Sequence, residues 1–201
     1  RFMQAIHQDD LERIVRSIEH SRAELTDWCE VFRVNHPKKG QIWISAKSSP
    51  IARADGSVEW NGYSEDVTEE VKSNERIKLL TAVFSTTSRG ILITTAESVI
   101  VDVNPAFEQI TGFKKHEVIG KKPSILSAKK QPDEFYQQMW TELLDKGCWQ
   151  GEVWNKRKSG EVFPEQLSID ALYDENGLVS HYIGAFDDIS SAVEKRQLLN
   201  E

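Results

Sequence analysis

One segment of this chain occurs twice, and the repeat constrains the fold more than any other feature of the sequence. The first copy begins at Glu30 and ends at Asp66-Val67-Thr68, and the second begins at Glu152 and ends at Asp188-Ile189-Ser190. A basic turn closing on glycine lies inside each copy. The corresponding end points are 122 positions apart. Because solenoid repeats are much shorter, this period indicates two tandem copies of one globular unit.

The composition and charge exclude several classes of protein. The 39% hydrophobic and 28% charged residues are ordinary for a soluble protein. A net charge of −7 gives no general attraction to nucleic acid or to an anionic membrane, and no apolar run approaches the roughly 20 residues that span a bilayer. Cys29 and Cys148 are too few for a disulfide framework or a zinc site. We expect buried or half-exposed thiols in a reducing cytoplasm.

The first copy is predicted to contain one helix and three antiparallel strands. Four apolar residues share one face of the helix: Leu11, Ile14, Val15 and Ile18. Asp9 or Asp10 can cap it. The strands are expected near residues 28–34, 41–51 and 57–66, separated by turns with Gly or Asp. Everything that precedes the helix in the second copy is missing here, so we expect the sequence to begin in the middle of a domain.

A stretch rich in Glu and Lys, from Val67 to about Val83, predicts a helix between the copies. Such a helix is on the order of 25 Å long. Two interpretations stay open. The helix can be a solvated linker, or it can be a dimer-forming connector, because its apolar residues recur at spacings near three and four.

The second copy is complete and predicts an α+β fold. Strands are expected at residues 90–95, 99–103, 149–155, 161–173 and 179–188. Between the second and third strands, Asn104 can cap a short helix that has Pro105 at its first position. A longer amphipathic helix is expected from Asp133 to Asp145. This order predicts a five-stranded antiparallel sheet with helices on one face.

Several motifs of the second copy occur together: Gly90-Ile91, Asn104-Pro105-Ala106-Phe107, Ile110-Thr111-Gly112-Phe113, Trp149-Gln150-Gly151-Glu152 and Asn155–Gly160. They resemble a PAS domain of the sensory-box type with its PAC half. Residues 1–68 resemble the PAC half of another PAS domain. The expected division is a first domain over 1–68, a helical linker over 69–84, a second PAS domain over 85–190 and an outgoing signalling helix over 191–201.

The resemblance implies a cytoplasmic sensory module of a bacterial signalling protein. Such modules are usually attached to a diguanylate cyclase, a phosphodiesterase, a histidine kinase or a transcription regulator, and we expect a homodimer. A ligand-free dimerisation scaffold is the alternative. This segment is expected to be non-catalytic and to hold no metal. Asp187 and Asp188 end a strand, and neither a Ser/His/Asp set nor a phosphate-binding loop accompanies them.

The resemblance also implies a small-molecule ligand, with FAD or FMN as the candidate. Ser124–Ser127 and the aromatic residues after it are similar to the flavin-binding PAS domains of nitrogen-fixation regulators. Pro123 occupies the position of the reactive Cys in light-sensing flavin domains, which excludes photoadduct chemistry. The expected cofactor-binding residues are Asn104, Trp140, Trp149, Asn155 and Glu165. The same tryptophans equally suit a packed core.

Other ligands fit the sequence less well. Haem is disfavoured, since the family's haem sensors use a His on the long helix and no His lies between His116 and His181. A small anion would need basic residues that face the pocket. The cations Lys156, Arg157 and Lys158 are instead expected on a solvated hairpin turn.

Both copies end in the same way, and this end is the expected signal junction. By resemblance, Asp66 and Asp188 join the last strand to the outgoing helix, together with Thr68 and Ser190. A carboxylate there can accept hydrogen bonds at the start of the helix and lies favourably at its positive end. The junction is therefore predicted to be both a helix cap and a hinge.

Overall fold

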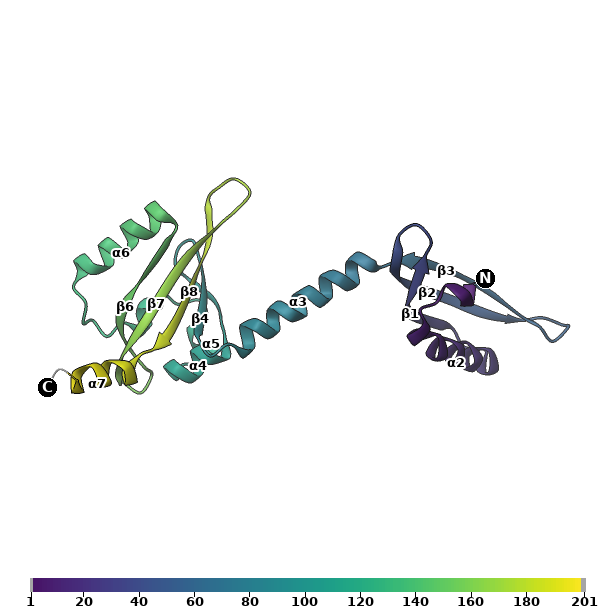
Figure 1. Cartoon of the computed structure of the whole chain (residues 1–201), viewed down its shortest axis with the longest axis horizontal. Helices are drawn as coiled ribbons and strands as arrows, with labels where there is room; N and C mark the ends of the chain where they lie inside the picture. Colours follow the sequence, from purple (N-terminus) through teal and green to yellow (C-terminus); the bar gives the residue numbers. More distant parts are fainter. Residues whose placement is uncertain (1, 200–201) are drawn as a thin grey trace. The chain divides into compact units, whose positions relative to one another are not determined.

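The computed structural model describes residues 2–199, and the chain divides into two compact units, residues 1–79 and 80–201 (Figure 1). Helix α3 (Thr68–Thr86) spans the boundary between them. Among the described residues, no helix combines the length and the apolar character needed to cross a membrane.

The second unit contains a five-stranded antiparallel sheet in the order β5-β4-β8-β7-β6. Its strands are β4 (Gly90–Thr95), β5 (Ile100–Val103), β6 (Cys148–Lys156), β7 (Val162–Tyr173) and β8 (Val179–Asp188). Its helices are α4 (Pro105–Thr111), α5 (Lys115–Val118), the short 3-10 helix η1 (Pro123–Leu126), α6 (Asp133–Lys146) and α7 (Ser190–Leu198). The predicted α+β fold with a five-stranded antiparallel sheet is confirmed.

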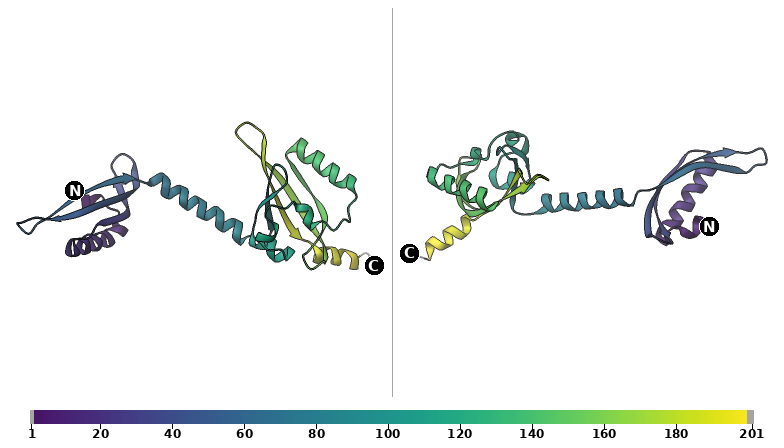
Figure 2. Two further views of the ribbon diagram at one scale, coloured as in Figure 1. Left: turned by 180° about the vertical axis from the view of Figure 1, so that it is seen from behind. Right: turned by 90° about the horizontal axis from the view of Figure 1, so that it is seen from above.

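The first unit contains the counterparts of β6, β7 and β8. Strands β1 (Trp28–His36), β2 (Gly40–Ala52) and β3 (Val58–Asp66) form an antiparallel sheet in that order. Helices α1 (Phe2–Ala5) and α2 (Gln8–Glu24) precede the strands, and α2 packs against β1 (Figure 2). The repeat in the sequence is therefore the hairpin pair that ends each unit.

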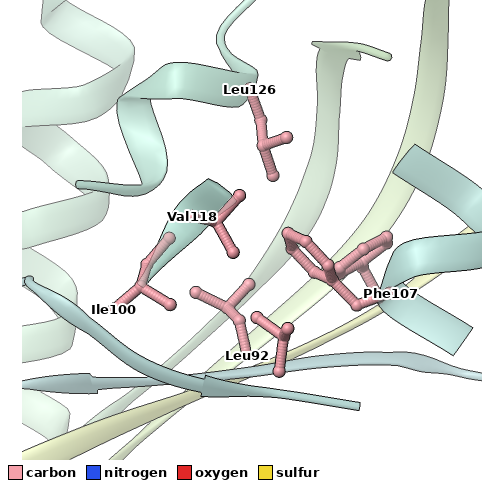
Figure 3. Packing of buried hydrophobic residues seen from close by; sticks show 7 residues of the cluster. Leu92, Ile100, Phe107, Val118 and Leu126 are labelled. Carbon is pink, nitrogen blue, oxygen red and sulfur yellow. The ribbon is translucent and has the colours of Figure 1, made fainter. Parts of the chain in front are cut away.

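The core of the second unit lies between its sheet and its helices. α6 packs on β6 and β7, and α4 packs on β4 (Figures 1 and 2). Buried side chains from β4, β5, α4, α5 and η1 converge in one cluster, labelled in Figure 3: Leu92, Ile100, Phe107, Val118 and Leu126. Phe107 also meets Phe186 of β8 edge to face, with ring centroids 5.9 Å apart. We call the face of the sheet that carries these side chains the inner face.

Two expectations about single residues were wrong. The cap of α2 is His7, whose Nδ1 accepts a hydrogen bond from the backbone N–H of Asp9. Asp10 lies one turn further and instead binds Arg33, which donates two guanidinium hydrogen bonds and one backbone hydrogen bond of 2.9 Å each. Both cysteines are exposed, because the adjacent tryptophan of each strand takes the inward position and successive side chains alternate.

Two neighbouring leucines of α6 test this arrangement of the core. Leu143 is 1% exposed and Leu144 is 66% exposed. We expect Leu143→Ala to lower the free energy of unfolding by about 2–5 kcal/mol, since it leaves a cavity. Leu144→Ala is the matched control and should change it by less than about 0.5 kcal/mol. Urea unfolding measures both, and equal effects would contradict the packing.

Candidate functional site

The inner face of the second sheet brings a carboxyl and an amide side chain together within the core. Glu165 of β7 lies between Val153 of β6 and Asp188 of β8 in the strand register. Side chains directly opposite each other on neighbouring antiparallel strands point to the same face. Asn155, on β6, donates from Nδ2 to Oε1 of Glu165 at 2.8 Å.

Glu165 is a buried acid that is only half satisfied. Its side chain is 1% exposed, and no described residue makes a hydrogen bond to its Oε2. Burial raises the pKa of Glu165 to about 8; the nearby charge of Asp188 adds to this effect, and the hydrogen bond from Asn155 opposes it. Because an isolated charge is costly in the interior, this carboxyl holds its proton at neutral pH.

The two tryptophans of the predicted ligand site lie in the aromatic part of the core. Trp140, on α6, meets Tyr182 with ring centroids 5.6 Å apart, and Trp149, on β6, meets Phe135 at 5.9 Å. The ring of Trp149 also covers Gly151, where a Cβ would come within 2.6 Å of it. Both rings therefore have protein partners, as in a packed core.

Asn104 lies at the start of α4 and has no hydrogen-bonding capacity left for a ligand. Its Oδ1 accepts from the backbone N–H of Ile91 at 2.8 Å and of Phe107 at 2.9 Å. Its Nδ2 donates to the carbonyls of Phe84 and Arg89 at 3.1 and 2.9 Å. These four bonds are all that an amide side chain can form at its lone pairs and protons. Asn104 thus joins the end of α3 to β4 and α4.

The predicted signal junction of the second unit is built around Asp188. Its Oδ1 accepts from the backbone N–H and the hydroxyl of Ser190 at 2.9 and 2.6 Å, and its Oδ2 accepts from Arg157 at 2.6 Å. Burial opposes ionisation of Asp188, but these hydrogen bonds outweigh burial and hold its pKa below the usual range. The capping position itself is taken by Ile189, whose side chain makes no capping bond.

The first unit repeats this junction with different residues. Asp66 Oδ1 accepts from the backbone N–H and the hydroxyl of Thr68 at 3.2 and 2.6 Å, and Oδ2 accepts from Lys39 at 2.7 Å. The hydrogen bonds from Lys39 and Thr68 lower the pKa of Asp66. In each unit the aspartate that ends the last strand is bound by a cation from an earlier turn, Lys39 between β1 and β2 or Arg157 between β6 and β7.

The expectation of a solvated basic turn was wrong for Arg157. Its side chain is 18% exposed, and its guanidinium lies 4.1 Å from the centre of the Phe163 ring. It also donates to the carbonyl of Ile110 on α4. The sequence feature that could have predicted this role of Arg157 is the basic turn that recurs before Asp66 and before Asp188.

Two shallow surface hollows lie along α2 and α6, and neither is lined by a predicted site residue. Within residues 2–199, no group of three or more His, Cys, Asp or Glu side chains is arranged to hold a metal ion.

Comparison with known families identifies both units. The family described as "PAS domain" matches residues 88–191, and the one described as "PAS fold" matches residues 1–64.

Curated relatives include regulators and a photoreceptor. The "Nitrogen fixation regulatory protein" of Klebsiella oxytoca is 31% identical over 112 residues, which cover 56% of this chain and 23% of that protein. The "Bacterioopsin transcriptional activator" of Halobacterium salinarum is 34% identical and the match covers 55% of this chain and 17% of that protein. The "Blue-light photoreceptor" of Listeria innocua is 30% identical, and the match covers 52% of this chain and 42% of that protein. The chain therefore spans less than half of each of these relatives.

Solved structures share the fold at low sequence identity. An "RNA-binding Light-Oxygen-Voltage Receptor" has a TM-score of 0.57 at 14% identity. The match covers 98% of this chain and 88% of the receptor chain. A PAS domain of a protein from Colwellia psychrerythraea has a TM-score of 0.55 at 22% identity, covering 58% of this chain and 98% of its own.

The buried acid predicts how stability depends on pH. In the unfolded chain Glu165 ionises near 4.5, whereas in the folded chain it ionises near 8. The contribution of Glu165 to stability is therefore highest below the first value and falls as pH rises toward the second, because the unfolded state binds fewer protons there. We expect Glu165→Gln to raise the free energy of unfolding by roughly 3 kcal/mol near pH 7 and by almost nothing near pH 4.

Urea unfolding at a series of pH values measures this difference. Glu175→Gln, at an exposed turn between β7 and β8, is the control and should show no pH-dependent gain. A gain from Glu165→Gln that is the same at both pH values would show that the carboxyl ionises normally.

Proposed function

The chain belongs to the PAS domain family, and we propose that it is the sensory input module of a signal-transduction protein. Relatives of the second unit carry the names of regulators and of a photoreceptor, which supports a role in signalling. The observation that carries the proposal is the repeated junction. Two units with different cores keep one carboxylate contact between the last strand and the next helix.

In the proposed mechanism the signal passes from the inner face to α7. A change beside β7 shifts β8, since these strands are hydrogen-bonded neighbours. Asp188 ends β8 and moves with it, so the start of α7 is released or repositioned. The helix then changes its packing or register, as a shift between two populated states. The receiver would be a diguanylate cyclase, phosphodiesterase or histidine kinase domain of the longer protein.

The proposed ligand is a flavin, FAD or FMN, at the inner face. The free Oε2 of Glu165 and the amide of Asn155 are suited to hydrogen-bond the polar edge of a planar ring. Trp140 and Trp149 would flank that ring, after repacking of their present aromatic contacts. When bound, the flavin would supply redox chemistry. A change in its redox state would reach the protein through its hydrogen bonds with Asn155 and Glu165.

An absorption spectrum with mass spectrometry tests the ligand. We expect the purified chain, after incubation with FAD or FMN, to absorb in the visible and to release flavin on denaturation. Asn155→Ala should weaken flavin binding about tenfold, the effect of roughly one hydrogen bond. Lys156→Ala, the exposed neighbour, should leave the affinity unchanged. A chain that binds neither flavin would rule out this ligand.

A second candidate function is a dimerisation scaffold without a ligand. It is favoured by α3, where four large apolar side chains are between 57 and 65% exposed: Ile77, Leu79, Leu80 and Val83. Packing of α3 against its copy in a second chain would cover them. Sedimentation of the flavin-free chain separates the candidates, since a scaffold dimerises without flavin and its dimer is unaffected by flavin.

A further inference from the structure

The two junctions differ at the inner-face position directly opposite the aspartate. In the second unit the residue opposite Asp188 in the strand register is Glu165, and in the first unit the residue opposite Asp66 is Ile44. Ile44 packs against the hydrophobic core of its unit. Because an apolar side chain serves at this position in one copy of the fold, the carboxyl in the other copy is not a requirement of the fold.

Glu165 faces another acid, Asp188, which is itself bound by a cation. From β6 it faces Val153 and the neutral amide of Asn155, and from β8 it faces the carboxylate of Asp188. Arg157, from the turn between β6 and β7, binds Asp188, and its Nε pairs with the exposed Glu161 at 3.3 Å. No described residue makes a hydrogen bond to Oε2 of Glu165. A negative charge on Glu165 would therefore lie beside that of Asp188, whose bound cation is Arg157.

We propose that Glu165 is a proton-binding site whose occupancy is transmitted to α7 through Asp188 and Arg157. With the proton bound, Asp188 keeps both Arg157 and Ser190. When the O–H bond breaks, the proton passes to water and the electron pair stays on the carboxylate. Two carboxylates then face each other and compete for one guanidinium. Arg157 is drawn from Asp188 toward Glu165, and the start of α7 loosens.

This inference rests on the proposed sensory role of the junction but needs no ligand. Since burial raises the pKa of Glu165 to about 8, the transition falls where an ordinary glutamate is already fully ionised. The first unit has the same junction with no acid at the matching position, and it therefore serves as a control within the same molecule.

Nuclear magnetic resonance of the 201-residue chain tests the proposal. The carboxyl carbon of Glu165 and the backbone amide of Ser190 are followed from about pH 6 to about pH 10. We expect both to titrate with one midpoint, whereas the amide of Thr68 at the first junction shows no such step. In Glu165→Gln the step at Ser190 should disappear while the signals of Thr68 stay unchanged.

Two results would overturn the proposal. Glu165 could titrate near 4.5, its ordinary value, or the step at Ser190 could persist in Glu165→Gln. If that variant does not fold, the unsubstituted chain still tests the proposal. Equal midpoints for the Glu165 carboxyl carbon and the Ser190 amide support it, and different midpoints contradict it. Failure of flavin binding would remove the proposed ligand and leave this titration intact, so the two proposals fail separately.

Discussion

The carboxylate of Asp188 fixes the point where the central part of the sheet becomes the outgoing helix. β8 lies between β4 and β7, so it is bonded to strands on both sides. Asp188 ends this strand and holds Ser190 through two hydrogen bonds, while Arg157 holds Asp188 from the hairpin turn. Because the same carboxylate binds both segments, we propose that a displacement of β8 or of the turn is passed to α7 through it.

Glu165, the acid next to this junction, lowers the free energy of unfolding, and the fold does not require a carboxyl at this position. A buried carboxyl without a partner for one oxygen lowers stability at neutral pH. In the first unit the matching position is apolar Ile44, and the junction around Asp66 forms equally well. Residues that reduce stability without a structural reason are concentrated at functional sites. Glu165 therefore supports our proposal that the second unit has the sensing role.

Much of the fold could be predicted from the sequence, because alternating apolar residues and turn residues are local signals. The buried contacts of the site could not. Two of the four bonds of Asn104 go to the carbonyls of Phe84 and Arg89, which lie 20 and 15 positions earlier in the chain. The inward position of Arg157 depends on an aromatic ring and a carboxylate from other strands. Asp10 is a plausible helix cap until Arg33 of β1 is placed beside it. Periodicity alone also gives no reason to bury a glutamate such as Glu165.

Hydrogen exchange at the start of α7 tests the junction most directly. The variant is Asp188→Ala, and the control is Asp187→Ala, which removes the neighbouring carboxylate that pairs with Arg89 at 2.9 Å. If Asp188 holds the helix, the amides of the first turn of α7 should exchange about tenfold faster or more in Asp188→Ala, as expected for a loss near 1.4 kcal/mol. They should keep their protection in Asp187→Ala. Unchanged protection in Asp188→Ala would contradict the view that this carboxylate couples the sheet to the outgoing helix.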